Sequence, residues 1–464
     1  MYDRLSPVEQ TPKSRRHIAV VGSGVSGLSA AWLLSQAHDV TLYEPGERLG
    51  GHAHTIDVPT PDGIVPVDTG FIVFNEPNYP NFTALLNYLD VPSKPAHMSF
   101  AVSMNDGGFE YSSHGAKGLF AQKRNLASPK FWRMLLDLKR FHRTAEADLC
   151  DLDVSLCSLG DYLNKGRYGA AFRDKHLLPQ AAAIWSSSSC KMADYPAAAF
   201  IRFYRNHRLL EVDLKPNWKT VDAGSRAYID ALAREFRGRI VSDAVARVER
   251  LPGQVTIHTA SGKSETFDGV VLATHSDQAL ALLDQPTADE TRLLGAICYS
   301  KNRVVMHRDP KLMPKRRAVW AAWNYVGAGK KGGGKAAEAS EDHPSVTYWM
   351  NLLQGLPGAP VFVTLNPEAE PAPATIIVDQ EFDHPIFNSA ALTAQQELWS
   401  LQGVQNTWFA GAWFGSGFHE DGLQVGLAVA EAIGGVKRPW SVENESGRIP
   451  LKIAVAQAPQ AASA

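Results

Sequence analysis

Short apolar segments alternate with amphipathic ones at the start of this chain. Residues 17–21 (HIAVV) form a continuous apolar run with the length of a buried parallel strand. Residues 25–36 follow a helical pattern, and residues 39–44 (DVTLYE) indicate a second strand. This order predicts a βαβ unit at the beginning of an α/β fold.

Strand patterns return twice further along the chain. Residues 240–274 contain several of them, and a strand at 406–414 runs toward a helix at 423–433. Between these blocks, residues 91–221 are helix-rich and aromatic, and residues 284–399 mix strands with loops. The alternation predicts one domain assembled from three separated segments and interrupted twice by a second domain.

The predicted boundaries follow from these blocks. The first domain comprises residues 17–90, 222–283 and 400–438, and the inserted, discontinuous α+β domain comprises residues 91–221 and 284–399. Residues 1–16 and 441–464 are predicted to be flexible tails, and the Gly/Lys/Ala-rich stretch 327–342 to be a flexible surface loop.

Composition excludes several classes of function. Lys+Arg 46 against Asp+Glu 48 gives a net charge of −2, without the basic excess that nucleic-acid binding requires. The four cysteines lack metal-ligand spacing, so we predict no metal site and free thiols. The N-terminus has no signal-peptide core, and no run of 18 apolar residues occurs, which favours a cytoplasmic protein.

The amphipathic segment 131–143 leaves a peripheral membrane contact open. Its broad apolar face carries Phe131, Trp132, Leu135, Leu138 and Phe141. The remainder is basic, with Arg133, Lys139, Arg140 and Arg143. Such a helix could dock on an anionic lipid surface. The simpler alternative is a surface helix that covers the inserted domain.

Gly22, Gly24 and Gly27 form G-x-G-x-x-G between the first strand and its helix. The first glycine permits the turn, the second lets the backbone approach a pyrophosphate, and the third lets the helix close on the sheet. The helix start supplies free N–H groups and the positive end of its dipole. Glu44 ends the second strand, where a carboxylate can accept hydrogen bonds from a ribose diol. Together these residues predict a dinucleotide site.

Two further segments favour FAD over a nicotinamide cofactor. The stretch GERLGGHAHT (46–55) places Arg48 and the Gly50–Gly51 pair directly after the acidic residue, where an extended FAD would pass. The stretch FAGAWFGSGFHEDGLQVGLAVAEAI (409–433) is a second glycine-rich turn into a helix, suited to the flavin end.

These motifs, with VDTGFIVF (67–74), resemble the flavin amine oxidase superfamily. A closer resemblance covers residues 17–436. It is to the flavoprotein domain fused ahead of plant cyclopropane fatty acid synthases and to its stand-alone bacterial relatives. The stretches that carry it include GFIVFNEPNYPNF, GLFAQKRN, VTYWMNLLQ and GFHEDGL. The resemblance implies a Rossmann-like FAD-binding domain with an inserted substrate domain.

The resemblance also implies the residues that contact FAD. They are Gly22, Ser23, Gly24, Val25, Ser26 and Gly27 at the pyrophosphate, Glu44 at the ribose, Arg48, Gly51 and His52 in the following loop, Gly70, Phe71, Ile72 and Val73 along the isoalloxazine, Val245 beside adenine, and Gly411, Asp421, Gly422 and Leu423 at the flavin end. Two positions depart from the amine oxidase pattern. His52 replaces an arginine, and Ala412 replaces the acid of F-A-G-E, whose ribityl contact Glu420 or Asp421 could take over.

Candidates for catalysis are few. His419 lies in the C-terminal glycine turn and could shuttle a proton near neutral pH, or simply bond the backbone or ribityl chain. Tyr348 and Trp349 alternate on a strand, so only one of them can line a cavity, and Trp323 and Asn324 pose the same choice. Lys301 is the nearest candidate for the amine oxidase lysine, although a surface lysine on a strand is the simpler interpretation.

The sequence therefore predicts an FAD-dependent oxidoreductase that dehydrogenates a fatty-acyl or lipid substrate. A lipid methyltransferase is a predicted partner, because the resembling plant domain is fused to one. Amine oxidation, flavin-dependent double-bond isomerisation without net redox change, and a non-catalytic flavin-bound role in a lipid pathway are the alternatives.

Overall fold

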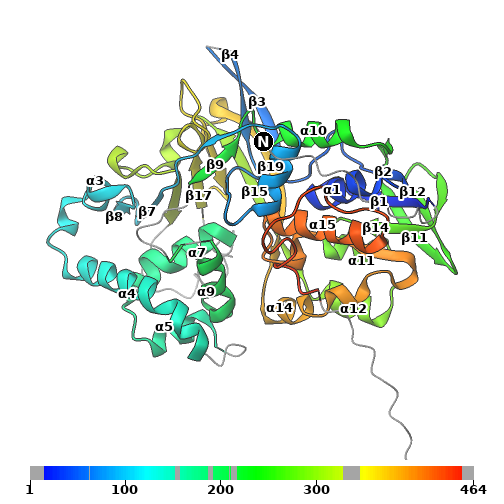
Figure 1. Cartoon of the computed structure of the whole chain (residues 1–464). Helices are drawn as coiled ribbons and strands as arrows, with labels where there is room; N and C mark the ends of the chain where they lie inside the picture. The colour runs from blue at the N-terminus through cyan, green and yellow to red at the C-terminus, as the bar shows by residue number, and fades with distance from the viewer. Residues whose placement is uncertain are drawn as a thin grey trace, which may run out of the picture. The chain divides into compact units, whose positions relative to one another are not determined.

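The computed structural model describes residues 15–61, 63–151, 157–185, 192–207, 209–210, 217–327 and 345–451 (Figure 1). The chain divides into two compact units. Unit 1 is Met1–Gly51, Ile229–Ile297 and Ala390–Ala464, and unit 2 is His52–Tyr228 and Cys298–Ser389.

Unit 1 is built around a five-stranded sheet in the order β10-β2-β1-β14-β20. Its neighbouring strands all pair in parallel. They are β1 (His17–Val21), β2 (Asp39–Tyr43), β10 (Arg239–Val241), β14 (Gly269–Leu272) and β20 (Thr407–Phe409). The chain leaves β1 toward β2 on one side, whereas β14 and β20 lie on the other side. Ligands of such sheets bind beyond the carboxyl ends of the strands at this reversal of strand order.

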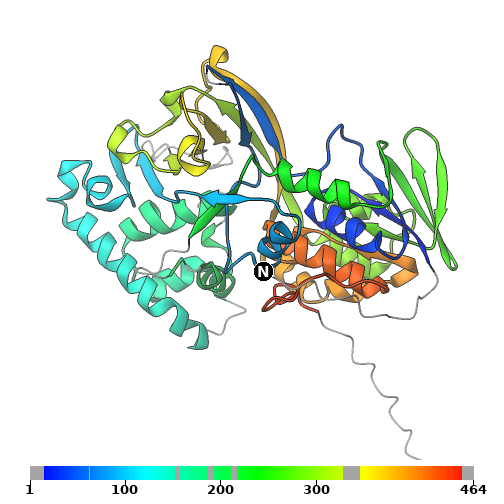
Figure 2. The ribbon, with the colours of Figure 1, turned by 45° about the horizontal axis from the view of Figure 1, so that its top comes forward.

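Two buried helices pack on each other beside this sheet. All residues of α1 (Val25–Leu34) are buried, as are most of α15 (His419–Ile433). A Cβ built on Gly426 would lie 2.2 Å from the carbonyl oxygen of Ser26, so the two helix backbones are in direct contact. Figures 1 and 2 both show the two helices side by side. Glycine on α15 therefore sets how close the two helices approach.

The remaining elements of unit 1 surround the parallel sheet. They are the antiparallel strands β11 (Val245–Leu251), β12 (Gln254–Thr259) and β13 (Ser264–Phe267), the helices α10 (Arg226–Glu235, which begins in unit 2), α11 (Ser276–Leu282), α12 (Ala288–Gly295) and α14 (Ser389–Gln395), and the short turns η7 (Leu398–Leu401), η8 (Val404–Asn406) and η9 (Ala412–Phe414).

Unit 2 contains a seven-stranded mixed sheet in the order β19-β15-β18-β17-β16-β7-β8. Its strands are β7 (Phe100–Met104), β8 (Phe109–Ser112), β15 (Cys298–His307), β16 (Trp323–Gly327), β17 (Ser345–Trp349), β18 (Phe362–Leu365) and β19 (Ile376–Ile386). Only β7 and β16 pair in parallel. The sheet joins the predicted segments 91–221 and 284–399.

The two faces of this sheet differ in chemistry. Directly paired residues share a face, so the register of the seven strands assigns their positions outside the irregularity at Ile376–Ile377. Face A carries Phe100, Val102, Met104, Phe109, Tyr111, Trp323, Tyr325, Gly327, Val346, Tyr348, Val363, Leu365, Cys298, Ser300, Asn302, Val304, Met306, Val378, Gln380, Phe382, His384 and Ile386. None of these is Asp, Glu, Lys or Arg. The charged residues of the strands, Glu110, Lys301, Arg303, Asp379, Glu381 and Asp383, all lie on the opposite face B.

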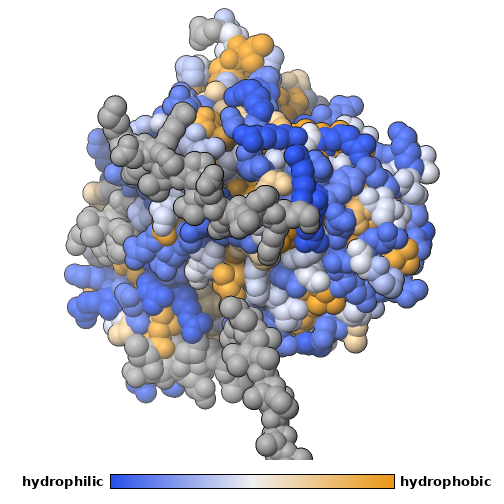
Figure 3. All heavy atoms as spheres, turned by 45° about the vertical axis from the view of Figure 1, so that its right-hand side comes forward, coloured by the Kyte–Doolittle hydropathy of each residue, from blue (hydrophilic) through white to orange (hydrophobic). Residues whose placement is uncertain are grey.

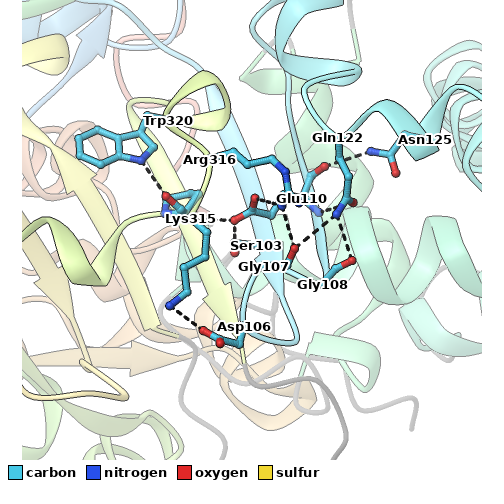
Figure 4. A network of polar contacts seen from close by, with 11 residues as sticks. Ser103, Asp106, Gly107, Gly108, Glu110, Gln122, Asn125, Lys315, Arg316 and Trp320 are labelled. Carbon is cyan, nitrogen blue, oxygen red and sulfur yellow. Dashed lines mark hydrogen bonds and ion pairs between the residues drawn. The ribbon is translucent and has the colours of Figure 1, made fainter.

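A polar network fastens a loop to face B (Figure 4). Buried Glu110 accepts hydrogen bonds from the Ser103 hydroxyl at 2.9 Å and the Lys315 backbone N–H at 2.7 Å, and pairs with Arg316 at 2.6 Å. The Trp320 indole donates to the Pro314 carbonyl at 2.8 Å within the same loop. Charge is thus concentrated on face B, away from face A.

Helices of unit 2 lie together (Figure 2), and aromatic side chains from several of them pack around Phe141 of α4. The helical elements of the unit are α2 (Pro80–Tyr88), α3 (Gly115–Leu119), η1 (Lys123–Asn125), α4 (Pro129–Asp151), α5 (Leu159–Lys165), α6 (Ala170–Phe172), η2 (Arg173–Leu177), α7 (Leu178–Trp185), α9 (Ala197–Asn206), η3 (Pro310–Leu312), η4 (Arg317–Val319), α13 (Met350–Leu353) and η6 (Pro373–Thr375). The rings of Phe172, Phe200 and Tyr204 lie 5.7, 6.5 and 6.1 Å from that of Phe141. Phe131 of α4 also packs on Tyr111 of face A at 5.6 Å. The helices therefore cover the β7–β8 end of face A.

Residues 52–90 differ from the predicted division, because they belong to unit 2. They contain the hairpin β3 (Thr55–Thr60) and β4 (Gly63–Asp68), and the short strands β5 (Phe74–Asn75) and β6 (Ser93–Pro95) pair with β9 (Trp218–Val221). Asp68 holds the hairpin to distant parts of the same unit through Ser225 and Gln354.

The C-terminal segment also departs from prediction in part. Residues 441–451, predicted to belong to a flexible tail, pack on α15: Ile449 is buried, and Arg448 pairs with Asp421 at 3.2 Å. The predicted flexible loop from residue 328, the segment SSSSC (186–190) and residues 452–464 lie outside the described residues.

Among the described residues, no helix combines the length and the apolar character needed to cross a membrane. The face drawn in Figure 3 is mostly hydrophilic, with apolar side chains in separate patches.

Three buried histidines and the half-buried His142 predict acid sensitivity. Burial lowers the pKa of His176 and His419 to about 3, and the pKa of His142 and His307 to about 4, from an ordinary value of 6.5. A folded pKa below the unfolded one means that stability is full above pH 6.5 and is lost as the pH falls toward the folded value. Each group lowers the free energy of unfolding by about 1.4 kcal/mol per pH unit in that window.

We therefore expect the midpoint of urea unfolding to fall markedly between pH 7 and pH 5. In His142→Gln one titrating group is gone, so its curve should fall less steeply with acidification than that of the wild type. Parallel curves for the two proteins would contradict the assignment of His142.

Candidate functional site

The predicted phosphate loop is built as a turn that only glycine permits. Gly22 has φ +97°, and its N–H donates to the Tyr43 carbonyl at 2.9 Å, which ties the loop to β2. A Cβ on Gly27 would lie 1.9 Å from the Gly22 carbonyl oxygen, so α1 closes directly on the turn. A Cβ on Gly24 would meet no atom within 4 Å. The space above Gly24 is where a ligand's phosphates would approach the backbone.

The start of α1 suits an anion. Gly24 is its N-cap residue, no side chain caps the helix, and its first turn holds no acidic residue. Uncapped N–H groups and the helix dipole favour negative charge at this position. Beside it, Gly50 donates its N–H to the Ser23 carbonyl at 3.0 Å, and Gly24 and Gly50 form a parallel bridge. Gly51, with φ +56°, therefore lies against Gly24 as the second loop of the same site.

Glu44 lies at the carboxyl end of β2 beside this loop. Its carboxylate accepts hydrogen bonds from the Ser23 N–H at 3.0 Å and the Ser23 hydroxyl at 2.5 Å, and from the Gly46 N–H at 3.0 Å. Its backbone N–H donates to Val241 of β10 at 3.0 Å. Glu44 is half-buried, so part of the carboxylate remains accessible to a ribose. Val245 follows β10 by four residues, close in sequence to this end of the sheet.

Glu44→Ala is expected to weaken FAD binding tenfold to a hundredfold. Charge-assisted hydrogen bonds at such a position contribute about 1.5–3 kcal/mol. Isothermal titration of FAD into the apoprotein measures the effect. Glu44→Gln keeps the shape but not the charge, and should fall between wild type and Glu44→Ala. Unchanged affinity in Glu44→Ala would contradict the assignment.

The C-terminal glycine turn follows β20. Gly411 has extended backbone, and Ala410 donates its N–H to Leu272 of β14 at 3.0 Å, which places the turn at the carboxyl edge of the sheet. Gly422 lies in the first turn of α15 with ordinary backbone, where a Cβ would approach Val25 and Ser26 at 2.8 and 2.9 Å. Gly422 therefore needs no positive φ, and the lack of a side chain serves the packing of α15 on α1. Leu423 is fully buried beside it.

The Asp421 carboxylate already has hydrogen-bond and ion-pair partners within the protein. Its carboxylate accepts hydrogen bonds from the N–H groups of Ser416 and Phe418 at 3.0 and 2.8 Å, and pairs with Arg448. It shapes the turn into α15, and a side-chain contact with the ribityl chain would compete with these bonds. Buried Glu420, the other substitute for the missing acid, accepts a bond from Gln424 at 2.9 Å.

The predicted isoalloxazine contacts of unit 2 form a group of their own. Gly70 lies so close to His52 that a Cβ would be 2.1 Å from the His52 carbonyl oxygen, which also accepts the Phe71 N–H at 2.9 Å. The Thr220 hydroxyl donates to the Ile72 carbonyl at 2.8 Å, and Val73 follows half-buried. This segment packs on face A: the His52 ring stacks on Phe382 at 4.8 Å.

Thr69, at the start of the same segment, accepts a hydrogen bond from Gln380 of face A at 2.8 Å. The segment is therefore joined to face A by a ring contact and by a hydrogen bond.

The surroundings of the catalytic candidates determine their protonation states and their exposure. Because burial lowers the pKa of His419 to about 3, its ring stays neutral at pH 7, which argues against a proton shuttle near neutral pH. Burial raises the pKa of Tyr348 well above its ordinary value, so it is a donor and not a base. Lys301 is exposed on face B of β15, as the simpler interpretation expected.

The strand register shows which face of the sheet carries each member of the pairs Tyr348/Trp349 and Trp323/Asn324. Trp323 and Tyr348 pair directly on face A with ring centroids 5.1 Å apart. Asn324 and Trp349 lie on face B, where Asn324 is fully buried and bonds to Ala321 and Thr347.

Sequence reasoning missed residues that hold the site together. Ala273 directly follows β14, and its carbonyl oxygen lies 2.9 Å from the Cβ position of Gly22, so that it leaves no room for a side chain there. Asp68 is buried and anchors β4 immediately before Thr69–Val73. An acidic residue inside the apolar VDTGF stretch was the available signal for Asp68; nothing local marks Ala273.

The residues of unit 1 fit FAD. An open glycine at the start of an uncapped helix, a second glycine loop beside it and an accessible carboxylate at the end of β2 meet the needs of a dinucleotide pyrophosphate and ribose. The residues that would hold it are the 22–27 loop, Glu44 and Gly50–Gly51.

Comparison with known proteins agrees with this geometry. The sequence model described as "Flavin containing amine oxidoreductase" matches residues 25–316. L-amino-acid oxidases of Notechis scutatus scutatus and Gloydius halys are 54% and 56% identical over 41 residues, which is 9% of this chain and 8% of each oxidase.

Solved structures share the fold along nearly the whole chain. A CLA-producing fatty acid isomerase from P. acnes superposes with a TM-score of 0.65 at 18% identity, covering 92% of this chain and 99% of that one. A putative protoporphyrinogen oxidase from Exiguobacterium sp. 255-15 gives 0.65 at 16%, covering 91% and 99%. Wild-type putrescine oxidase bound to putrescine gives 0.65 at 14%, covering 90% and 99%. The chain therefore belongs to the flavin-containing amine oxidoreductase family, a family of enzymes whose cofactor is FAD.

Proposed function

We propose that this protein is an FAD-dependent oxidoreductase that dehydrogenates a fatty-acyl chain, free or within a lipid. The observation that carries the proposal is face A of unit 2. Across all seven strands, its positions hold no Asp, Glu, Lys or Arg. A long apolar chain is the substrate class that such a surface would bind without a desolvation cost.

One row of directly paired residues runs across five strands of face A. Trp323, Tyr348, Val363, Met306 and Val378 follow one another across β16, β17, β18, β15 and β19. Trp323, Tyr348 and Val378 are half-buried, so side chains at both ends of the row remain partly accessible. Val363 and Met306 between them are buried, so in the proposal the acyl chain contacts Val378 at the β19 end of the row and continues toward Phe382 and the His52–Val73 segment.

The proposed chemistry removes two hydrogens from adjacent carbons and forms a C=C bond. FAD, when bound, would accept the hydride and become reduced, and the second hydrogen would be released to the solvent as a proton. The protein orients the chain on face A and excludes water from it. Tyr348 remains protonated because burial raises its pKa, so it can donate a hydrogen bond but not accept the proton.

Sequence resemblance supports a lipid substrate. The stretches GFIVFNEPNYPNF and VTYWMNLLQ resemble the flavoprotein domain fused ahead of plant cyclopropane fatty acid synthases. A lipid-modifying methyltransferase remains the proposed partner on this ground. Double-bond isomerisation is the second candidate, since a fatty acid isomerase shares the fold over 92% of this chain. Amine oxidation is disfavoured by the uncharged face A and by Ala412 in place of an acid.

Anaerobic titration with a panel of free fatty acids, phospholipids and amines tests the proposal through the flavin absorbance band. Bleaching by an acyl lipid, with the desaturated product found by mass spectrometry, is expected. Bleaching by amines alone would establish amine oxidation instead. A shifted double bond without net bleaching would establish isomerisation. No reduction and no product with any lipid would leave a non-catalytic flavoprotein.

A matched pair of variants on β19 tests the role of face A. Val378→Asp puts a charge beside the proposed chain and should raise the KM for the acyl substrate at least tenfold (about 1.4 kcal/mol). Glu381→Gln, on face B of the same strand, should leave the KM unchanged. Equal effects of the two substitutions, at equal melting temperatures, would contradict the assignment.

A further inference from the structure

The exposed surface of α3–α4 in unit 2 carries an unusual combination of charge and apolar side chains. Residues 113–143 contain eight Lys or Arg and one acidic residue, in a chain with net charge −2. That acidic residue, Asp137, is buried and already paired with Arg133 and Arg140 at 3.3 and 3.1 Å. The basic charge of this segment is therefore almost uncompensated.

Large apolar side chains are exposed among these charges. Leu126, Trp132 and Leu136 are 52%, 46% and 64% exposed. On α4, Trp132, Leu136, Lys139 and Arg143 follow at helical spacing along the face opposite the buried residues, and the two basic members are exposed. The outward stripe thus runs from apolar side chains to basic ones.

This stripe differs from the face that the sequence suggested. Phe131 and Phe141 of the expected docking face are buried at 2% and 0% exposure, where they pack on Tyr111 and on the helical cluster. The apolar side chains available for docking are instead Trp132 and Leu136, with Leu126 on the preceding turn. Trp132 is held in place, because its indole N–H donates to the Leu126 carbonyl at 2.8 Å.

Basic side chains flank the apolar group on both sides. Lys123, Arg124 and Lys130 are exposed around Leu126. Lys130 and Arg124 also act on the neighbouring Lys175. Burial lowers the pKa of Lys175, and the positive charges of Lys130 and Arg124 lower it further. Clusters of four to eight basic residues next to exposed Trp and Leu suit the interface of an anionic bilayer.

We propose that this surface, here called the α4 stripe (Leu126, Trp132 and Leu136 with the surrounding Lys and Arg side chains), binds an anionic phospholipid bilayer peripherally. Charge complementarity selects the partner: basic residues bind the headgroups, and the three apolar side chains enter the boundary of the acyl region. Each Lys or Arg near such a surface contributes about 1 kcal/mol, and this attraction is screened by salt.

Vesicle flotation of the full-length holoprotein tests the proposal. Vesicles of phosphatidylcholine in which roughly one lipid in three is phosphatidylglycerol supply the negative surface potential. Binding to these vesicles at 0.1 M salt, a Debye length of about 10 Å, is expected, with much weaker binding to pure phosphatidylcholine and at higher salt.

Two double variants separate charge from apolar contact. Lys123→Glu with Arg124→Glu should weaken binding at least tenfold, and Leu126→Gln with Leu136→Gln about fivefold, each with an unchanged melting temperature because the side chains are exposed. Leu251→Gln with Lys263→Glu, exposed positions of unit 1, is the matched control and should bind like wild type.

Equal binding to anionic and zwitterionic vesicles, or loss of binding in the control alone, would overturn the proposal. Release from the vesicles by a short DNA duplex at equimolar phosphate would also overturn it, in favour of a nucleic-acid surface. Since flotation needs no substrate, the result is independent of which compound reduces the flavin.

Discussion

Gly27→Ala is expected to yield a destabilised protein that retains almost no FAD. The added Cβ would lie 1.9 Å from the carbonyl oxygen of Gly22 and 2.9 Å from the Cβ of Ala273. The first of these atoms is backbone within the phosphate loop, so relief requires α1 to move away from the turn. Such overpacking costs about 3 kcal/mol and opens the site at the same time. Urea unfolding of the apoprotein and FAD released on heat denaturation measure the two effects.

Gly295→Ala is the control for this substitution. Gly295 ends α12 in the same unit, and its Cβ would meet only the Leu280 side chain, at 3.8 Å. The control should keep wild-type stability and FAD content. Normal FAD content in Gly27→Ala would show that α1 does not close on the loop as described.

Asp68→Ala is expected to lower the free energy of unfolding by about 3–5 kcal/mol. The carboxylate is 1% exposed and accepts hydrogen bonds from the hydroxyls of Thr55 and Ser225 at 2.6 and 2.8 Å, from the Ser225 N–H at 2.9 Å and from Gln354 at 2.8 Å. Removing it leaves buried donors without their acceptor. Because Asp68 precedes Thr69–Val73, FAD affinity should fall with stability.

The neighbouring Asp57 offers a matched control on the same hairpin. It forms an exposed ion pair with Arg226, and such pairs contribute about 0–1 kcal/mol. Urea unfolding should therefore separate Asp57→Ala, close to wild type, from Asp68→Ala. Similar losses in both variants would show that the Asp68 network is not what holds the hairpin.

Features that are set locally were predictable from the sequence. The turn at Gly22–Gly27 and the acid Glu44 require only a strand, a helix and a strand in register, so 28 adjacent residues (17–44) carry the whole signal. The predicted α/β fold class is confirmed, and strands such as β1 and β14 are short apolar runs that the local sequence shows. The amphipathic pattern of α4 was also recognisable.

Features that depend on distant pairing were not predictable. Asp68 bonds to residues 157 and 286 positions away, and these bonds place residues 52–90 in unit 2. Face A exists only through the register of seven strands drawn from both halves of the chain. Phe131 and Phe141 of α4 turn toward aromatic partners that the sequence of α4 does not contain, so the sequence alone could not decide between a docking face and a helix that covers the inserted domain.

The burial of individual groups was equally beyond the sequence. Nothing in the motif indicates that burial lowers the pKa of His419 to about 3. Nor does it indicate that the Asp421 carboxylate accepts hydrogen bonds from the backbone of the preceding turn. Sequence resemblance assigns roles to positions of the motif, but it does not give the bonds that each side chain makes.

The FAD affinity of Gly24→Val shows whether the phosphates of FAD approach the backbone at Gly24. In the apoprotein this side chain begins in open space, with no atom within 4 Å of its Cβ, so the melting temperature should equal that of the wild type. The side chain occupies the space of the pyrophosphate, so FAD binding should weaken at least a hundredfold, or about 2.7 kcal/mol. Wild-type FAD affinity in a stably folded Gly24→Val protein would show that the phosphates do not bind at Gly24.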